Sequence, residues 1–141
     1  MNYTLTPEPG FINFSAFAFR RWALHYYKCR HDFVNPHKFS PIPYFLLCRA
    51  IELELKARHL EKKRQPEVRR TFGHRIKSAY LALPKCERIL DAEELLVLQK
   101  ANSIYASKGF EYILPSDAAT AYKRFPDLDA LDRLAKKLLA V

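Results

Sequence analysis

The sequence predicts an all-α protein folded as an up-and-down antiparallel bundle of four to five helices. Apolar residues recur every three or four positions through most of the chain, as on one face of a helix. Only 3 glycines accompany 9 prolines, and apolar residues rarely alternate with polar ones, so few strands and tight turns are expected. With 141 residues, 49% of them hydrophobic, the chain has the size of one domain, residues 1–141. Residues 1–10 contain two prolines and a glycine and are expected to form an arm that orders only by docking.

The central predicted helix, residues 43–63, is the element around which the others pack. Pro41 and Pro43 suit a first helical turn, where a missing N–H costs nothing, and the next proline is Pro66. Apolar residues fall on two stripes of this helix, which should therefore pack on two sides. The stripes comprise Tyr44, Cys48, Ile51 and Leu55, and Leu46, Ala50, Leu53, Ala57 and Leu60.

A polar ridge lies between the two stripes and comprises Arg49, Glu52, Lys56, His59 and Lys63. Glu52 lies four residues before Lys56, an orientation in which an ion pair stabilises a helix. On physical grounds alone we favour a solvated, salt-bridged face. The alternative is a rigid row of cations and one carboxylate that the helix presents to a ligand or to a second subunit.

A first helix, residues 11–33, and a third helix flank this central one. A polar connector, residues 64–71, with room for one helical turn, leads to the third helix, which Phe72-Gly73-His74 opens. His74 in a first helical turn would face the positive end of the helix dipole, which favours its neutral form and suits a general base near pH 7. The alternative is a histidine that only caps the turn. The predicted core face of the first helix is aromatic and comprises Phe11, Phe14, Ala18, Trp22, Tyr26, Cys29 and Phe33.

The C-terminal part of the chain continues the bundle. Asp91 and Glu94 form a capping box at the start of a fourth helix, residues 91–107, and Lys108 and Gly109 close it. A short helical piece, 116–124, and a terminal amphipathic helix, 126–140, follow.

Positive charge is concentrated in residues 56–77. This segment carries nine lysines or arginines against Glu61 and Glu67, a net charge of +7, whereas the rest of the chain carries only +2 of the total of +9. Clustered cations favour nucleic acid or another polyanion, because neutralised phosphates release counterions. A connector that is basic only for solubility is the alternative.

The sequence favours a cytoplasmic protein without a metal, a cofactor or a membrane anchor. Cys29, Cys48 and Cys86 are odd in number and form no Cys-x-x-Cys pair, so neither a disulfide framework nor a zinc knuckle is expected. His25 lies one turn before Cys29, but no second pair of ligands completes a metal site at a recognisable spacing. The charge-free residues 9–19 are too few to span a bilayer. Motifs for phosphate-cradling loops, nucleophile elbows and paired catalytic carboxylates are missing from the sequence.

Three separated motifs resemble the HEPN superfamily of small prokaryotic helical domains. They are Pro43-Tyr-Phe-Leu-Leu-Cys-Arg-Ala-Ile-Glu52-Leu-Glu-Leu-Lys56-Ala, Phe72-Gly73-His74, and Tyr105-Ala-Ser-Lys108-Gly-Phe-Glu-Tyr112. The resemblance implies a helical bundle, commonly dimeric, in a superfamily with metal-independent endoribonucleases of toxin–antitoxin and defence systems and non-catalytic partners of nucleotidyltransferases. It places Glu52 and Lys56 at polar family positions of the central helix, and His74 at the opening of the next helix.

The chain departs from the ribonuclease members of that superfamily at one motif. Those members share Arg-x(4 to 6)-His near the start of the last main helix, and this chain has no histidine after His74. Arg69-Arg-Thr-Phe-Gly-His74 has the same spacing, but it precedes the third helix.

Two classes of function follow from the sequence. In the first, RNA, a nucleotide or another anion binds to Arg49, Glu52, Lys56, His59, Lys63, Arg70 and Lys108. If such a protein cleaves RNA, His74 is the general base and Arg69 stabilises the charge on the attacked phosphate, without a metal. In the second, the chain is a non-catalytic dimeric scaffold or a partner subunit of a nucleotidyltransferase-type enzyme. An exposed patch that includes Phe17, Phe19 or Tyr27 would support this second class.

Overall fold

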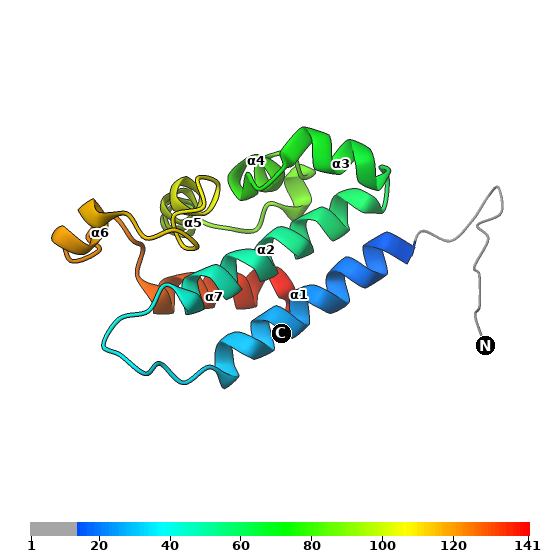
Figure 1. Ribbon diagram of the computed structural model, residues 1–141. Helices are drawn as coiled ribbons and strands as arrows, with labels where there is room; N and C mark the ends of the chain where they lie inside the picture. The colour runs from blue at the N-terminus through cyan, green and yellow to red at the C-terminus, as the bar shows by residue number, and fades with distance from the viewer. Residues whose placement is uncertain (1–13) are drawn as a thin grey trace.

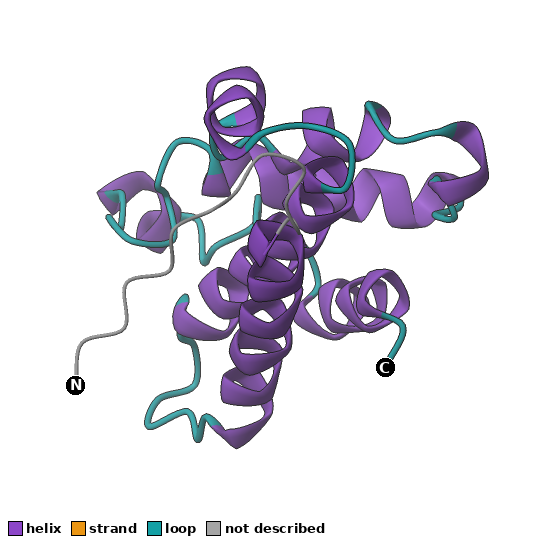
Figure 2. Ribbon diagram, turned by 90° about the vertical axis from the view of Figure 1, so that its right-hand side faces the viewer, coloured by secondary structure: helices purple, strands orange, loops and turns teal. Residues whose placement is uncertain are grey.

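The computed structural model describes residues 14–141, and every regular element within this part is a helix (Figure 1; Figure 2). The all-α bundle predicted from the sequence is confirmed. The expected arm, residues 1–10, and the predicted core residue Phe11 lie outside the described residues. In chain order the helices are α1 (Phe14–Asp32), α2 (Ile42–Leu60), α3 (Gln65–Phe72), α4 (Ile76–Leu81), a 3₁₀ turn (Lys85–Glu87), α5 (Ala92–Tyr105), α6 (Pro115–Ala119) and α7 (Leu128–Leu139).

Helix α2 is the centre of the fold. It forms an antiparallel pair with α1, lies beside α7, and is covered by α3, α4 and α5 from the other side (Figure 1). Leu47, Ile51, Leu55 and Leu60 are fully buried along it. The prediction of a central helix packed on two sides is therefore confirmed, and any residue of α2 lies close to several other helices.

Helix α1 buries a face that differs from the predicted one. Ala16 and Ala23 are buried in the core, whereas Trp22 is 55% exposed and Cys29 is also exposed. Small side chains at a helix contact let two helices approach closely, so the alanines take the place expected for the aromatic residues. The predicted aromatic core face is wrong at Trp22 and Cys29.

Residues 64–71, predicted as a polar connector, form most of helix α3. A proline in its first turn and two arginines, Arg69 and Arg70, in its last turn suit the helix ends. Val68 and Phe72, one turn apart, are buried and fix the helix to the core. The connector prediction is wrong because two apolar residues are enough to anchor so short a helix.

Gly73 ends α3 and sets the position of His74. Its φ of 54° and ψ of −123° lie in a region that L side chains rarely adopt. The chain therefore leaves the helix at Gly73 and starts α4 only at Ile76. The predicted place of His74 in a first helical turn is wrong: His74 lies in the loop between α3 and α4.

The ends of α5 follow the prediction more closely. The Asp91 carboxylate accepts a hydrogen bond from the Glu94 backbone, and the Glu94 side chain accepts one from the Asp91 backbone, so the capping box is confirmed. Beyond the helix, Lys108 has a φ of 60°. A Cβ atom on Gly109 would lie 2.7 Å from the Ile104 side chain, so this close approach requires glycine.

Replacing Gly73 by alanine should lower the free energy of unfolding by about 1–3 kcal/mol, because alanine is strained at a positive φ. No atom lies within 4 Å of the added Cβ, so a steric clash would not contribute. Urea denaturation measures the change, with Ser78→Ala on the exposed side of α4 as the control, expected within about 0.5 kcal/mol of wild type. Equal stabilities of Gly73→Ala and Ser78→Ala would contradict this account of the loop.

Candidate anion-binding pocket

Glu52 is a buried carboxylate in the middle of α2. Its side chain is only 1% exposed, and Lys56 and His59 are buried with it. The interpretation of the polar ridge as a solvated face, which the sequence favours, is therefore wrong. Helical spacing places the ridge on one face of α2, and in the fold α3 and the loop that follows it cover that face.

Four side chains from three parts of the chain converge on the Glu52 carboxylate. His74 Nδ1 lies 2.5 Å and Lys56 Nζ 3.4 Å from Oε1. The Tyr105 hydroxyl, from the end of α5, donates to Oε2 at 2.9 Å, and the Arg49 guanidinium donates to the same oxygen. Both carboxylate oxygens are thus satisfied, as a buried charge requires.

These contacts keep Glu52 ionised. Burial alone would raise the pKa of its carboxyl, but Lys56, the hydrogen bond from His74, Arg49 and Tyr105 together hold that pKa below its ordinary value. An ionised carboxylate only accepts hydrogen bonds, so the Nδ1 atom of His74 carries a proton and donates it. The other ring nitrogen, Nε2, is then the one available for a ligand, and the His74 side chain is 53% exposed.

Tyr105 belongs to this network, although the sequence singles it out only as the first residue of the third motif. Burial raises the pKa of its hydroxyl, and the charge of Glu52 raises that pKa further, so Tyr105 stays a neutral donor. The ring also contacts His74 edge-on, with centroids 6.0 Å apart. A buried tyrosine hydroxyl needs a hydrogen-bond partner. The polar ridge of the central helix is the sequence feature that could supply one.

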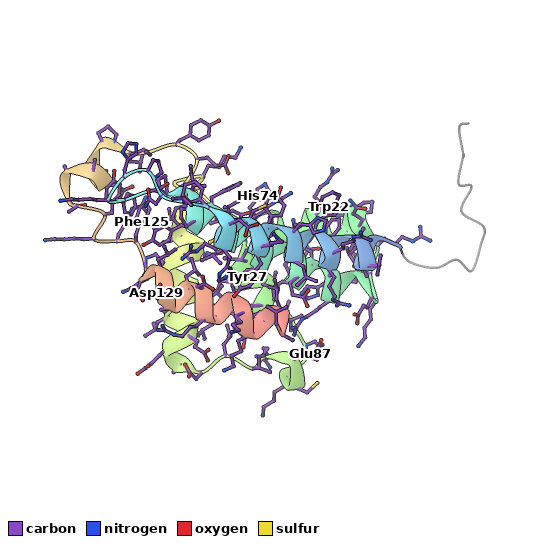
Figure 3. The ribbon with its side chains drawn as sticks, turned by 90° about the horizontal axis from the view of Figure 1, so that it is seen from below. Trp22, Tyr27, His74, Glu87, Phe125 and Asp129 are labelled. Carbon is purple, nitrogen blue, oxygen red and sulfur yellow. The ribbon has the colours of Figure 1, made fainter. Side chains whose placement is uncertain are left out.

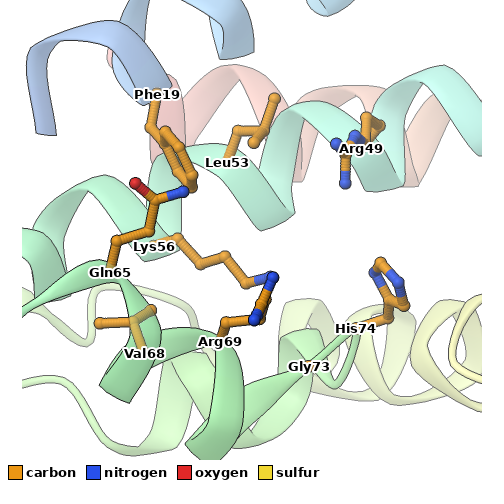
Figure 4. Close-up of a pocket in the computed structure, with 9 residues that line it drawn as sticks. All are labelled: Phe19, Arg49, Leu53, Lys56, Gln65, Val68, Arg69, Gly73 and His74. Carbon is orange, nitrogen blue, oxygen red and sulfur yellow. The ribbon is translucent and has the colours of Figure 1, made fainter. Parts of the chain in front are cut away.

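A pocket of about 230 Å³ opens beside the network, between α1, α2 and α3 (Figure 4). Figure 4 shows Arg49 and His74 facing one another across it, and Lys56 and Arg69 pointing toward one another. Within residues 14–141, Arg69 forms no ion pair with a carboxylate. The lining comprises Phe19, Arg49, Leu53, Lys56, Gln65, Val68, Arg69, Gly73 and His74.

The lining therefore holds more positive than negative charge. Three basic side chains, Arg49, Lys56 and Arg69, line the pocket, no carboxylate of residues 14–141 lines it, and Glu52 lies buried behind them. Like charges brought together in a partly buried site repel one another, and an anion between them would remove that repulsion. Arginine and lysine each carry several donors, so Arg49 and Lys56 can bond to Glu52 and still offer N–H groups to a ligand.

Five residues predicted to bind a ligand do not line this pocket, and Glu52, buried behind it, is one of them. His59 Nε2 donates to the Ala79 carbonyl at 2.8 Å, so His59 connects α2 to α4. The Lys63 ammonium lies 5.8 Å from the centre of the Phe72 ring, a cation–π contact. Arg70 and Lys108 are exposed to solvent.

Comparisons with known proteins add no relative: no protein-family model, no curated protein and no solved structure matches this chain. Within residues 14–141, no helix has the length and hydropathy needed to cross a bilayer. The described part of the chain also contains no group of three histidine, cysteine, aspartate or glutamate side chains placed to hold a metal ion. The geometry of the pocket is thus the evidence from which its function is inferred.

Replacing Glu52 by glutamine should lower the free energy of unfolding by about 3 kcal/mol, because the change leaves the Lys56 and Arg49 charges without their counter-charge in a buried site. Glu61→Gln, at the residue that caps the C-terminal end of α2, is the matched control. Glu61 is half-exposed and pairs with Arg20 at 3.0 Å, so its loss should cost less than about 1 kcal/mol. Urea denaturation of both variants tests this, and equal losses would show that burial adds nothing to the Glu52 contacts.

Stability should also depend on pH through Glu52. Because its folded pKa lies below the ordinary value of about 4.3, the contribution of the carboxylate is fully present above that value. It is lost as the pH falls through the lower folded pKa. Urea denaturation from about pH 7 to about pH 3 should show the stability difference between wild type and Glu52→Gln shrinking with acid. A difference that stays constant over this range would contradict a lowered pKa.

Proposed function

We propose that this protein binds the phosphate groups of RNA in the pocket formed by Arg49, Lys56, Arg69 and His74. The observation that carries the proposal is the convergence of three basic side chains and His74 on a pocket whose lining, within residues 14–141, contains no carboxylate. Charge-assisted hydrogen bonds from arginine and lysine are the usual means of holding phosphate oxygens. The buried Glu52 positions these donors and does not compete with a ligand at the surface.

A polymer is a better ligand than a single nucleotide, because exposed cations lie on the segments that precede and follow α3. These exposed basic residues are Lys62, Arg64 and Arg75. Their charges can contact successive phosphates, and counterion release rewards each contact. A free nucleotide would occupy the pocket without contacting these cations.

Metal-independent cleavage of that RNA is a second candidate function, and the Glu52–His74 pair favours it. The Glu52 carboxylate fixes the His74 ring with Nδ1 protonated and 2.5 Å away, so Nε2 is the ring nitrogen left to act as a base. A carboxylate that orients a catalytic histidine in this manner also stabilises the imidazolium formed after proton transfer. The same arrangement agrees with the proposed HEPN membership.

The cleavage step can be written with the residues of the pocket. His74 Nε2 takes the proton of a ribose 2′-hydroxyl, and the 2′-oxygen attacks the adjacent phosphorus. The bond from phosphorus to the 5′-oxygen breaks, and that oxygen takes a proton from water; the hydroxide left behind takes the proton from His74 Nε2, which restores the neutral ring. The products are a 2′,3′-cyclic phosphate and a 5′-hydroxyl, while Arg69 and Arg49 stabilise the charge on the phosphate oxygens.

The alternative role, a dimeric scaffold or a partner of a nucleotidyltransferase-type enzyme, is supported by the exposed side of α1. Phe17 is 66% exposed, as this alternative requires, whereas Phe19 and Tyr27 are partly buried against the core. A homodimer through α1 is compatible with RNA binding, since Arg69 and His74 lie on other elements. The proposed setting is a toxin–antitoxin or defence system in the cytoplasm. The three cysteines are free, which agrees with a reducing compartment.

Arg69→Ala should weaken binding of a short fluorescein-labelled RNA about tenfold, because it removes a charge-assisted contact. It should also reduce the slope of log affinity against log salt by about one phosphate contact. Arg70→Ala is the control: the two residues are neighbours with the same charge, but only Arg69 lines the pocket. Fluorescence anisotropy at several salt concentrations measures both variants. Equal losses would mean that the basic surface binds RNA without using the pocket.

If the second candidate function is right, the purified protein should cleave a mixed RNA pool in EDTA, and His74→Ala should abolish cleavage. His37→Ala, at an exposed loop position, should cleave as wild type does. Products are resolved by length on a denaturing gel. A His74→Ala variant that still cleaves would contradict the mechanism, and intact RNA with every variant would leave binding as the function.

A further inference from the structure

A second cavity continues the phosphate pocket along α1. It has a volume of about 360 Å³ and is lined by Phe19, Trp22, Tyr26, Arg49 and Leu53. We call it the aromatic groove. Phe19, Arg49 and Leu53 line both cavities, so the two form one continuous surface with a cationic end and an aromatic end.

Trp22 is the exposed aromatic side chain of this groove. It is 55% exposed, and its ring contacts the neighbouring His25 edge-on, with centroids 5.2 Å apart. In Figure 3 Trp22 and His74 are labelled along the same edge of the molecule. A large aromatic ring beside a cavity, outside the core, is typical of a surface that receives a ligand.

Arg49 connects the two cavities electrostatically. Its guanidinium donates to Glu52 and lies 5.8 Å from the centre of the Tyr26 ring. One side of this cation therefore faces the phosphate pocket, while the other lies over an aromatic ring of the groove. A ligand that satisfies both must join an anionic group to a flat, apolar one.

We propose that the aromatic groove receives a nucleobase of single-stranded RNA, stacked on Trp22, while the phosphate beside that base lies in the pocket; this rests on the proposed function. Nucleotides join an anion to a flat ring, which matches the charge and shape of the combined surface. Bases stack on exposed aromatic side chains when they are unpaired. A base in a duplex is already stacked between its neighbours, so the groove selects single strands.

The chain contains one tryptophan, which makes its fluorescence a direct report on the groove. The probe is a single-stranded RNA of about eight nucleotides carrying 2′-O-methyl groups, so that cleavage through the 2′-hydroxyl cannot occur. A stacked base should quench Trp22 in a saturable manner, with the same midpoint as the anisotropy of a fluorescein-labelled copy. An oligonucleotide of the same length whose backbone carries no bases should bind more weakly and quench little, and a duplex should also quench little.

Variants at the groove separate stacking from structure. Trp22→Ala should weaken binding of the single strand about tenfold, the effect of one lost base stack, whereas Trp22→Phe should keep most of the affinity. Phe17→Ala is the matched control, because Phe17 is an exposed aromatic residue of α1 that lines neither cavity. It should bind as wild type does.

Each outcome has a distinct meaning. Binding by anisotropy without quenching, or equal affinity for the base-free backbone, would overturn the stacking site and leave phosphate binding intact. A change in oligomeric state of Trp22→Ala on size-exclusion chromatography, with RNA affinity unchanged, would assign the groove to a protein interface instead. No binding of any oligonucleotide would overturn the proposed function and this inference together.

Discussion

A single buried carboxylate constrains this structure more than any other group. Glu52 lies in the middle of the helix that contacts most of the others, and a charge at that position must be matched by donors. The donors come from four places: one turn before Glu52, one turn after it, the loop after α3, and the end of α5. They are Arg49, Lys56, His74 and Tyr105. The hydrogen bonds to Glu52 therefore connect α2, the loop after α3 and the end of α5 at one place.

The hydrogen bonds that Glu52 requires also explain why the pocket is basic. Donors that serve Glu52 on one side retain unused N–H groups on the other, and Arg69 adds a cation that no carboxylate of residues 14–141 pairs with. Gly73 makes this possible, because its positive φ releases the chain from α3 and brings His74 to the carboxylate. A buried anion at the back and cations at the front form a site suited to phosphate.

The sequence predicts the class of fold and the central helix well, because apolar spacing over some twenty residues is a strong signal. It also places Glu52, Lys56 and Arg49 on one face. What covers that face cannot be read from spacing, and so the ridge is mistaken for a solvated surface. The buried face of α1 is predicted wrongly for a related reason. Periodicity gives the right helix, but Ala23 is buried in the core while its neighbour Trp22 is exposed. Tyr105 and Gly73 act through a tertiary contact and a local backbone conformation, and apolar periodicity reports neither.

The most direct test of the account is an NMR titration of the histidine rings with a short single-stranded 2′-O-methyl RNA. His74 lines the pocket, and His59 is a buried histidine of the same ridge bonded to a backbone carbonyl, so one spectrum contains both the reporter and its control. The account predicts that the His74 ring signals shift in a saturable manner while those of His59 stay in place. Unchanged His74 signals in a sample that binds the RNA, or shifts of both rings together, would contradict a phosphate site organised by Glu52.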